Sequence, residues 1–159
     1  MDLFGRPSEA LSLLNRALEL NPSFSMAYGL LGDVNLAMGN SDEAIRLSEM
    51  SIRLNPRNPS VYFRYAALAT ANFAKKDHSK TVHWANQTIA LKPDYWLGYA
   101  LAAASSAESG DLESAKQSAS LLMQLWPEAS ISQMKEVFSQ TSPWWKRFED
   151  GLIAAGIPA

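Results

Sequence analysis

His78 and His83 are the first candidates for metal ligands in this chain, and their spacing argues against that role. They are five positions apart, which on an α-helix separates them by about 140° around the axis. A metal-binding pair on one helix needs a spacing of three or four, which places both rings on one face. The chain also has no cysteine. We therefore predict no metal site and interpret both histidines as solvated or hydrogen-bonded side chains.

The acidic pairs Asp42-Glu43 and Glu149-Asp150 could in principle supply a general acid and base. They fall at the ends of expected helices, where such charges are better explained as surface or dipole-matching groups. No serine lies in a Gly-x-Ser-x-Gly turn, and the glycines are isolated rather than grouped into a phosphate-binding loop. The sequence therefore predicts a chain that is not an enzyme and that uses no cofactor.

The charge and hydropathy of the chain exclude further classes of partner. The formal net charge of the 159 residues is -2, which favours neither nucleic acid nor anionic lipid. The basic cluster 75–80 is interrupted by Asp77 and is interpreted as a solvated turn. The longest mostly apolar run, 96–104, is far shorter than the roughly 20 residues that cross a bilayer. Residues 1–10 do not resemble a signal peptide, so we predict a cytoplasmic protein without membrane contact.

A repeating set of prolines indicates how the chain is organised. Pro22, Pro56, Pro93 and Pro127 are separated by 34, 37 and 34 residues. The residue two positions before each of them is a leucine: Leu20, Leu54, Leu91 and Leu125. A period near 34 residues is typical of helix–turn–helix units that stack, because one such unit cannot bury its apolar face alone. The spacing predicts an all-α superhelix.

Turn residues within each repeat predict where the helices end. In the second repeat a helix over 26–38 is closed by Gly39, and a second helix runs to the Asn55-Pro56 stop. In the fourth repeat Gly110 closes the first helix and Asp111 caps the second. The third repeat is three residues longer and has Lys76 where the others have glycine. We therefore expect the extra residues near 73–76 and a first helix about one turn longer.

The ends of the chain depart from the period. Before Pro22 there is one helix, Pro7 to Leu20, with a stub at 3–5, and after Pro127 two short helices are expected at 130–139 and 143–155. A solenoid needs a polar cap at its ends, and these last helices are the candidates. The predicted divisions of this single domain are a half-repeat at 1–22, repeats at 23–56, 57–93 and 94–127, and capping helices at 128–159.

Six residues of the second repeat follow a known pattern. They are an aromatic residue, a Leu-Gly pair, a glycine, an alanine and a closing proline: Tyr28, Leu31, Gly32, Gly39, Ala44 and Pro56. This pattern resembles the tetratricopeptide repeat (TPR), and the resemblance covers residues 3–127. The chain departs from it at Asn35 and Ser106, where the family usually has tyrosine. The resemblance implies an α-solenoid of a half-repeat, three repeats and a C-terminal cap, acting as a protein-protein interaction scaffold.

A narrower resemblance concerns the tail. The long third repeat and residues 148–158 look like the C-terminal end of certain proteobacterial signalling proteins, in which such repeats follow a class III adenylate/guanylate cyclase domain or a winged-helix domain. This resemblance implies an alternative function, a regulatory module of a larger signalling protein or transcription regulator. No cyclase or DNA-binding residue lies within the 159 positions.

In tetratricopeptide folds the first helix of each repeat lines the concave surface, which implies a peptide groove here. The lining residues would be Met26, Asp33, Leu36, Phe63, Ala67, Thr70, Leu97, Ala100, Ala104 and Glu108. The Lys, Arg and Asn residues with which chaperone-binding members hold a carboxylate are missing from these positions. A small, apolar lining favours an apolar peptide or helix, which could equally be the protein's own C-terminal helix.

Two apolar sets are candidates for self-association. The first lies on the helix of the incomplete first repeat and the second on the last helix: Leu11, Leu14 and Leu18, and Trp144, Trp145 and Phe148. Exposed apolar area of this size usually marks an interface. For the first set we predict a homodimer or an upstream helix. For the aromatic set, packing onto the fourth repeat as a cap is the alternative to partner binding.

Overall fold

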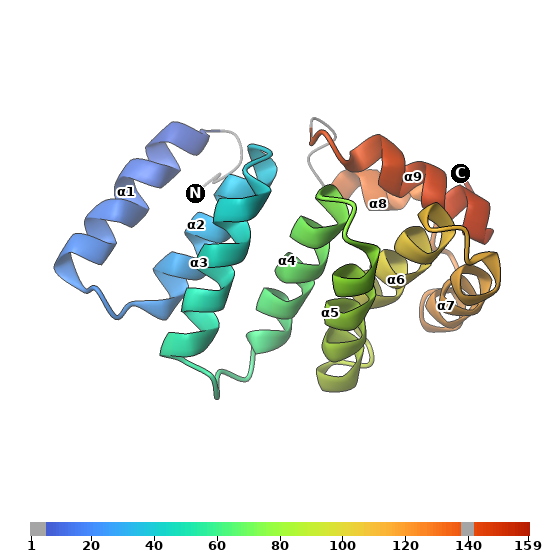
Figure 1. Cartoon of the computed structure of the whole chain (residues 1–159), viewed down its shortest axis with the longest axis horizontal. Helices are drawn as coiled ribbons and strands as arrows, with labels where there is room; N and C mark the ends of the chain where they lie inside the picture. Colours follow the sequence, from blue (N-terminus) through green and yellow to red (C-terminus); the bar gives the residue numbers. More distant parts are fainter. Residues whose placement is uncertain (1–5, 138–141) are drawn as a thin grey trace.

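The computed structural model describes residues 6–137 and 142–159, and this part of the chain contains helices and no strands (Figure 1). The helices are α1 (Pro7–Leu20), α2 (Ser25–Ala37), α3 (Ser41–Leu54), α4 (Val61–Ala74), α5 (His78–Leu91), α6 (Trp96–Glu108), α7 (Leu112–Leu125), α8 (Ile131–Val137) and α9 (Trp145–Ala155). The all-α prediction is confirmed. The predicted stub at 3–5 lies outside the described residues, as does the end of the helix expected at 130–139. No described helix combines the length and the apolar character that crossing a membrane requires.

Three helical hairpins, α2–α3, α4–α5 and α6–α7, stack side by side (Figure 1). The first helices of neighbouring hairpins contact one another, α2 with α4 and α4 with α6, whereas the second helices do not. The stack therefore curves toward its first helices. We call the face formed by α2, α4 and α6 the inner surface, and it is the one that the family resemblance assigns to partner binding.

The turns within the three hairpins have the same length, which corrects the expected place of the insertion. Each turn spans three residues, 38–40, 75–77 and 109–111. The connection from α3 to α4 has six residues, where the corresponding connections at 21–24 and 92–95 have four. Helix α4 has 14 residues against 13 in α2 and α6. The predicted place of the extra residues, near 73–76, was therefore wrong, because two of the three precede α4, and α4 is longer by one residue rather than by about one turn.

Lys76 explains why that prediction failed. It adopts a left-handed conformation with φ of 63°, as Gly39 (84°) and Gly110 (90°) do at the equivalent positions. Glycine adopts this conformation without steric cost, whereas a residue with a Cβ atom is strained in it. The hairpin geometry imposes the turn on lysine all the same. Lys76 thus replaces the repeating glycine, and the turn itself is unchanged.

The core consists of two clusters of buried side chains. One joins α1, α2 and α3 through Ala10, Leu14, Ala27, Leu31, Val34 and Leu47. The other runs from α4 to α9 and includes the aromatic residues Phe73, Trp144, Trp145 and Phe148. Helix α9 is therefore part of the core of the C-terminal half. It ends at Gly156, whose φ of 102° is a left-handed closure of the kind that glycine favours.

Candidate binding surface

Helix α9 covers the C-terminal half of the inner surface. It packs chiefly along α6, with further contacts to α7. Phe148 is 0% exposed, and its ring meets that of Phe73 on α4 at 5.9 Å in an edge-to-face arrangement. Trp144 packs on the same ring at 6.5 Å. Pro143, just before α9, reaches the turn at Gly39. The last helix therefore lies across the inner surface rather than extending the stack beyond α7.

Small residues allow α9 to approach α6 at backbone distance. Ala100 and Ala104, two of the predicted groove residues, are completely buried. A Cβ atom added to Gly151 of α9 would lie 2.7 Å from the carbonyl oxygen of Ala104, which is closer than real Cβ atoms approach. Only glycine fits at this crossing. The small, apolar lining predicted for the groove is, in this half, the docking site of the chain's own helix.

Arg147 fixes α9 to the ends of two other helices. Its Nε and Nη2 donate to the two carboxylate oxygens of Glu108 at the end of α6, at 2.5 and 2.7 Å. Nη2 and Nη1 also donate to the carbonyl oxygens of Phe73 and Ala74, at 2.9 and 3.2 Å. These are the last two residues of α4, whose carbonyls lack intrahelical partners. The hydrogen bond from Arg147 holds the pKa of Glu108 below its ordinary value.

Among the described residues, no helix covers the N-terminal half of the inner surface in this way. Met26 on α2 is 62% exposed and Phe63 on α4 is 42% exposed. They flank a cleft of about 180 Å³ between the two helices, which we call the open cleft. Its lining consists of Met26, Gly29, Leu30, Ser51, Asn58, Ser60, Phe63 and Arg64. Two large apolar side chains beside a hollow provide an anchor point for a partner side chain.

Phe63 is held in place by two tyrosines. Its ring centroid lies 4.3 Å from that of Tyr62 and 5.4 Å from that of Tyr95, the latter edge-to-face. The two tyrosine rings meet at 5.3 Å. Burial raises the pKa of Tyr95 to about 12, so this phenol stays neutral under physiological conditions. The exposed face of Phe63 is thus presented from an uncharged aromatic cluster.

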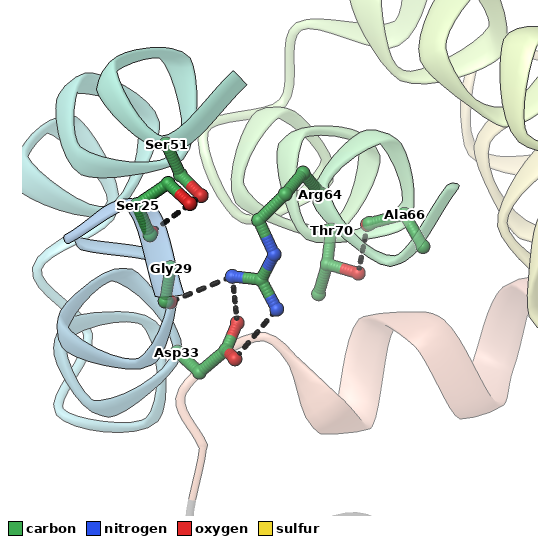
Figure 2. Close-up of polar contacts among 7 residues, drawn as sticks. All are labelled: Ser25, Gly29, Asp33, Ser51, Arg64, Ala66 and Thr70. Atoms are coloured by element: carbon green, nitrogen blue, oxygen red, sulfur yellow. Dashed lines mark hydrogen bonds and ion pairs between the residues drawn. The ribbon is translucent and has the colours of Figure 1, made fainter. Parts of the chain in front are cut away.

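Arg64 crosses from α4 to α2 at the edge of the open cleft (Figure 2). Nη1 donates to the carbonyl oxygen of Gly29 at 2.6 Å and to Oδ1 of Asp33 at 2.9 Å. Nη2 donates to Oδ2 of Asp33 at 2.8 Å, which completes a bidentate ion pair. Gly29 leaves room for the guanidinium, since a Cβ atom there would lie 3.1 Å from Nη1. The pair therefore joins two neighbouring repeats.

The predicted groove residues have different environments in the structure. Met26 and Phe63 border the open cleft, and Asp33, Leu36 and Ala67 are half-buried. Thr70, Leu97, Ala100 and Ala104 are buried, and Glu108 is engaged by Arg147. The predicted groove residues are thus divided between two parts of the inner surface. We call the N-terminal part, which contains the open cleft, the open half, and the C-terminal part under α9 the filled half.

The sequence analysis missed Leu30 and Arg64. Arg64 follows Phe63 and was not among the predicted lining residues, and adjacent residues point about 100° apart on a helix. Its long side chain nevertheless reaches the inner surface. An opposite charge one repeat earlier, at Asp33, was the signal that could have identified it.

The residues proposed for self-association pack within the chain. Leu14 is buried against α2, and Leu11 and Leu18 are half-buried in the same cluster. Trp144, Trp145 and Phe148 are buried in the core of the C-terminal half. The aromatic set therefore has the environment of a cap rather than of an exposed patch. On α1, the large apolar side chains that remain exposed are Leu13 and Leu20.

Other candidate sites lie on α5 and its neighbours. Nδ1 of His78 is 3.1 Å from Oγ of Ser105, and the ring of His83 contacts Trp84. The described residues contain no cluster of three or more His, Cys, Asp or Glu side chains that could hold a metal ion. A shallow groove of about 600 Å³ lies between α5, α6 and α7. Its lining mixes serine and amide side chains, such as Ser79, Asn86 and Gln117, with apolar side chains, such as Val82, Ile89 and Leu121.

Comparisons with known proteins agree with the fold and with the repeat pattern. The family model of the tetratricopeptide repeat matches residues 4–71. The crystal structure of MamA superposes with a TM-score of 0.69 at 16% sequence identity, over 98% of this chain and 93% of MamA. The MamA RS-1 ArsTM double mutant gives 0.69 at 15% identity, over 95% of this chain and 85% of that one.

These similarities confirm the tetratricopeptide prediction, by sequence over 4–71 and by fold over nearly the whole chain. Identities this low show a shared fold and nothing about partners. Neither match indicates a cyclase-like protein or a winged-helix regulator, so the narrower resemblance of the tail is not borne out.

Proposed function

We propose that this tetratricopeptide repeat protein is a non-catalytic scaffold that binds an apolar segment of a partner protein in the open cleft. The observation that carries the proposal is the exposure of Met26 and Phe63 beside a hollow on the inner surface. Exposed apolar side chains scattered singly need no explanation, but a pair that flanks a cleft is typical of an interface.

The size of the open cleft favours a protein segment over a small molecule. Pockets for small molecules usually enclose about 300–1,000 Å³, whereas the open cleft has about 180 Å³. That volume suits a single side chain that anchors a longer segment lying across α2 and α4. The aromatic and aliphatic lining favours an apolar anchor.

Helix α9 supports the choice of a helical segment. It shows that the inner surface of this chain accommodates an amphipathic helix whose aromatic face points inward. The surface under α9 and the open cleft are neighbouring parts of one face, since α4 contributes Phe73 to the first and Phe63 to the second. Recognition of a partner helix by its i, i+3 and i+4 side chains is a common mode for such grooves.

The test is a selection with the full chain as bait. The probe is a phage-displayed library of alanine-based helices with one face randomised. We expect enrichment of peptides with apolar residues at i, i+3 or i+4 and i+7. Phe63→Ala should weaken the selected peptides about tenfold or more, because a buried anchor is worth at least about 1.4 kcal/mol.

Leu91→Ala is the matched control, because Leu91 is also exposed but lies at the end of α5. It should leave the affinity unchanged. Failure to enrich any helix would contradict the proposal, and so would binding that is indifferent to Phe63. The predicted homodimer and the cytoplasmic location stay predictions.

A further inference from the structure

Two of the five N–H donors of Arg64 have no acceptor among the described residues. Nη1 uses both of its hydrogens and Nη2 uses one, on Gly29 and Asp33. The remaining donors are Nε–H and the second hydrogen of Nη2, which point in parallel from one edge of the planar group. Nε is not among the buried atoms that lack a partner and is therefore not sealed from solvent. Arg64 lines the open cleft and keeps a two-donor edge that faces away from Gly29 and Asp33 (Figure 2).

The available edge is held in a fixed orientation. The side chain of Arg64 is only 17% exposed. The carboxylate of Asp33 accepts two hydrogen bonds from the guanidinium, one from Nη1 and one from Nη2. The carbonyl oxygen of Gly29 accepts the other hydrogen bond from Nη1. A donor pair fixed in advance loses little conformational entropy when it binds an acceptor.

Arg147 forms a comparable set of hydrogen bonds in the C-terminal half of the molecule. One edge of its guanidinium donates to the carboxylate of Glu108. Two of its three remaining hydrogens donate to the last two carbonyl oxygens of α4. The end of a helix presents such carbonyls without intrahelical partners and carries a partial negative charge, which a guanidinium stabilises.

The charge of the Arg64 pair favours the same kind of acceptor. Asp33 already offsets much of the guanidinium charge, so a second carboxylate gains less net attraction here than at an unpaired arginine, and it must also give up its hydration. A main-chain carbonyl at a helix end forms the same hydrogen bonds at a smaller desolvation cost. The pair is therefore better matched to the end of a helix than to an anionic side chain.

We propose that Arg64 is a specificity-determining residue that binds the last main-chain carbonyls of the partner helix. The inference rests on the proposed function, because it concerns the orientation of the segment in the open cleft. The apolar face of the helix contacts Met26, Leu30 and Phe63, and its C-terminal end lies at Arg64. Partner segments would then be helices that end within the cleft, rather than longer helices that pass through it.

The experiment uses the selected peptides, synthesised with acetylated N-termini and amidated C-termini, and measures their affinity for full-chain variants by calorimetry. Arg64→Lys keeps the charge but loses the two-donor edge, and we expect binding about tenfold weaker. Arg46→Lys is the control, since Arg46 forms a similar pair with Glu43 on α3. It should bind like the wild type. Urea unfolding of both variants verifies that they are folded.

Gly29→Ala provides a second route should Arg64→Lys not fold. The added methyl group displaces the guanidinium by a few tenths of an ångström, and alanine strengthens α2 at the same time. We expect weaker peptide binding in a variant that is as stable as the wild type. If the folded Arg64→Lys or Gly29→Ala variant binds the peptides as the wild type does, while Phe63→Ala still weakens them, the role of Arg64 is overturned. The proposed function then remains intact.

Two further outcomes are informative. Binding that depends on neither Phe63 nor Arg64 would contradict the proposed function itself. The same peptides with a free C-terminal carboxylate should bind no more tightly than the amides. A tenfold gain for the carboxylate form, lost in Arg64→Lys, would overturn the helix-end assignment in favour of an anion site.

Discussion

The two halves of the inner surface differ in where their large side chains come from. Under α9 the part of the surface that α6 contributes is made of small residues such as Ala100 and Ala104, and Phe148 and Trp144 of the C-terminal segment supply bulk against it and against Phe73 of α4. In the open half the surface supplies its own bulk, with Met26 and Phe63 pointing outward. A helix can reach backbone distance only where both faces are small, as at Gly151. The open half therefore suits a partner that is held at side-chain distance.

Each half contains an arginine paired with a carboxylate, but the two arginines differ in how many of their hydrogen-bond donors have an acceptor. Arg147 donates to Glu108 and to two carbonyls, and so closes the contact between three helices. Arg64 donates to Asp33 and Gly29 and keeps one edge available. The contact in the filled half is therefore closed within the chain, whereas the open half keeps donors available for the partner that we propose.

Removing the central aromatic residue of each half should have the largest and most unequal effect. We expect Phe148→Ala to lower the free energy of unfolding by about 3–5 kcal/mol, because the ring is fully buried and leaves a cavity. Phe63→Ala should lower it by less than about 1 kcal/mol, because that ring is partly exposed. Urea unfolding followed by tryptophan fluorescence measures both. Equal losses would show that the halves are not organised differently.

Adding one methyl group to each half should give a smaller contrast. Gly151→Ala places a Cβ atom against the backbone of Ala104, which cannot move aside, and we expect a net loss of about 1–2 kcal/mol after the gain in helix propensity. Gly29→Ala meets only the side chain of Arg64 and should stay within about 1 kcal/mol of the wild type. Thermal unfolding of the two variants tests this, and a reversed order would contradict backbone contact at α9.

The smallest expected effect is a pH dependence confined to the filled half. The pKa of Glu108 is lowered by its hydrogen bond to Arg147, so the folded state binds the proton less readily than the unfolded state. The stabilisation is complete above the ordinary pKa of 4.5 and is lost as the pH falls through the lower folded value. We expect less than about 1 kcal/mol, because the pair is partly exposed.

Glu108→Gln is the variant that isolates this contribution. The difference in unfolding free energy between wild type and variant should be constant from pH 6 to 8 and should shrink below about pH 4.5. Urea titrations at pH 7 and pH 3 provide the two points. A difference that grows on acidification would refute the assigned direction.

Residues that act through local backbone conformation were predictable from the sequence. Gly39, Gly110 and Gly156 mark left-handed closures, and Asp111 caps α7 by accepting a hydrogen bond from the backbone of Ser114. Each of these depends on neighbours a few positions away. The exception, Lys76, shows the limit, because a hairpin held by packing on both sides can impose its turn on an unfavourable residue.

The candidate site was predicted only in part, because it depends on contacts between distant segments. The spacing identified Met26 and Phe63 but assigned Ala100 and Ala104 to the same groove, where the structure places α9. Arg64 was missed because its role requires Asp33 across a repeat boundary. A periodic pattern defines which face of a helix is apolar, not which of several apolar surfaces it will cover.

The sequence by itself determined the repeating hairpins. The proline period, the turn glycines and the apolar spacing act locally and divide the chain into hairpins, with the third repeat as the exception in its helix bounds. The tertiary structure alone decided that α9 lies on the C-terminal half of the inner surface and leaves the other half open. The physical reason is close packing: Gly151 can meet the backbone of Ala104, whereas the large exposed side chains of Met26 and Phe63 beside the open cleft keep an approaching helix from the backbone of α2 and α4.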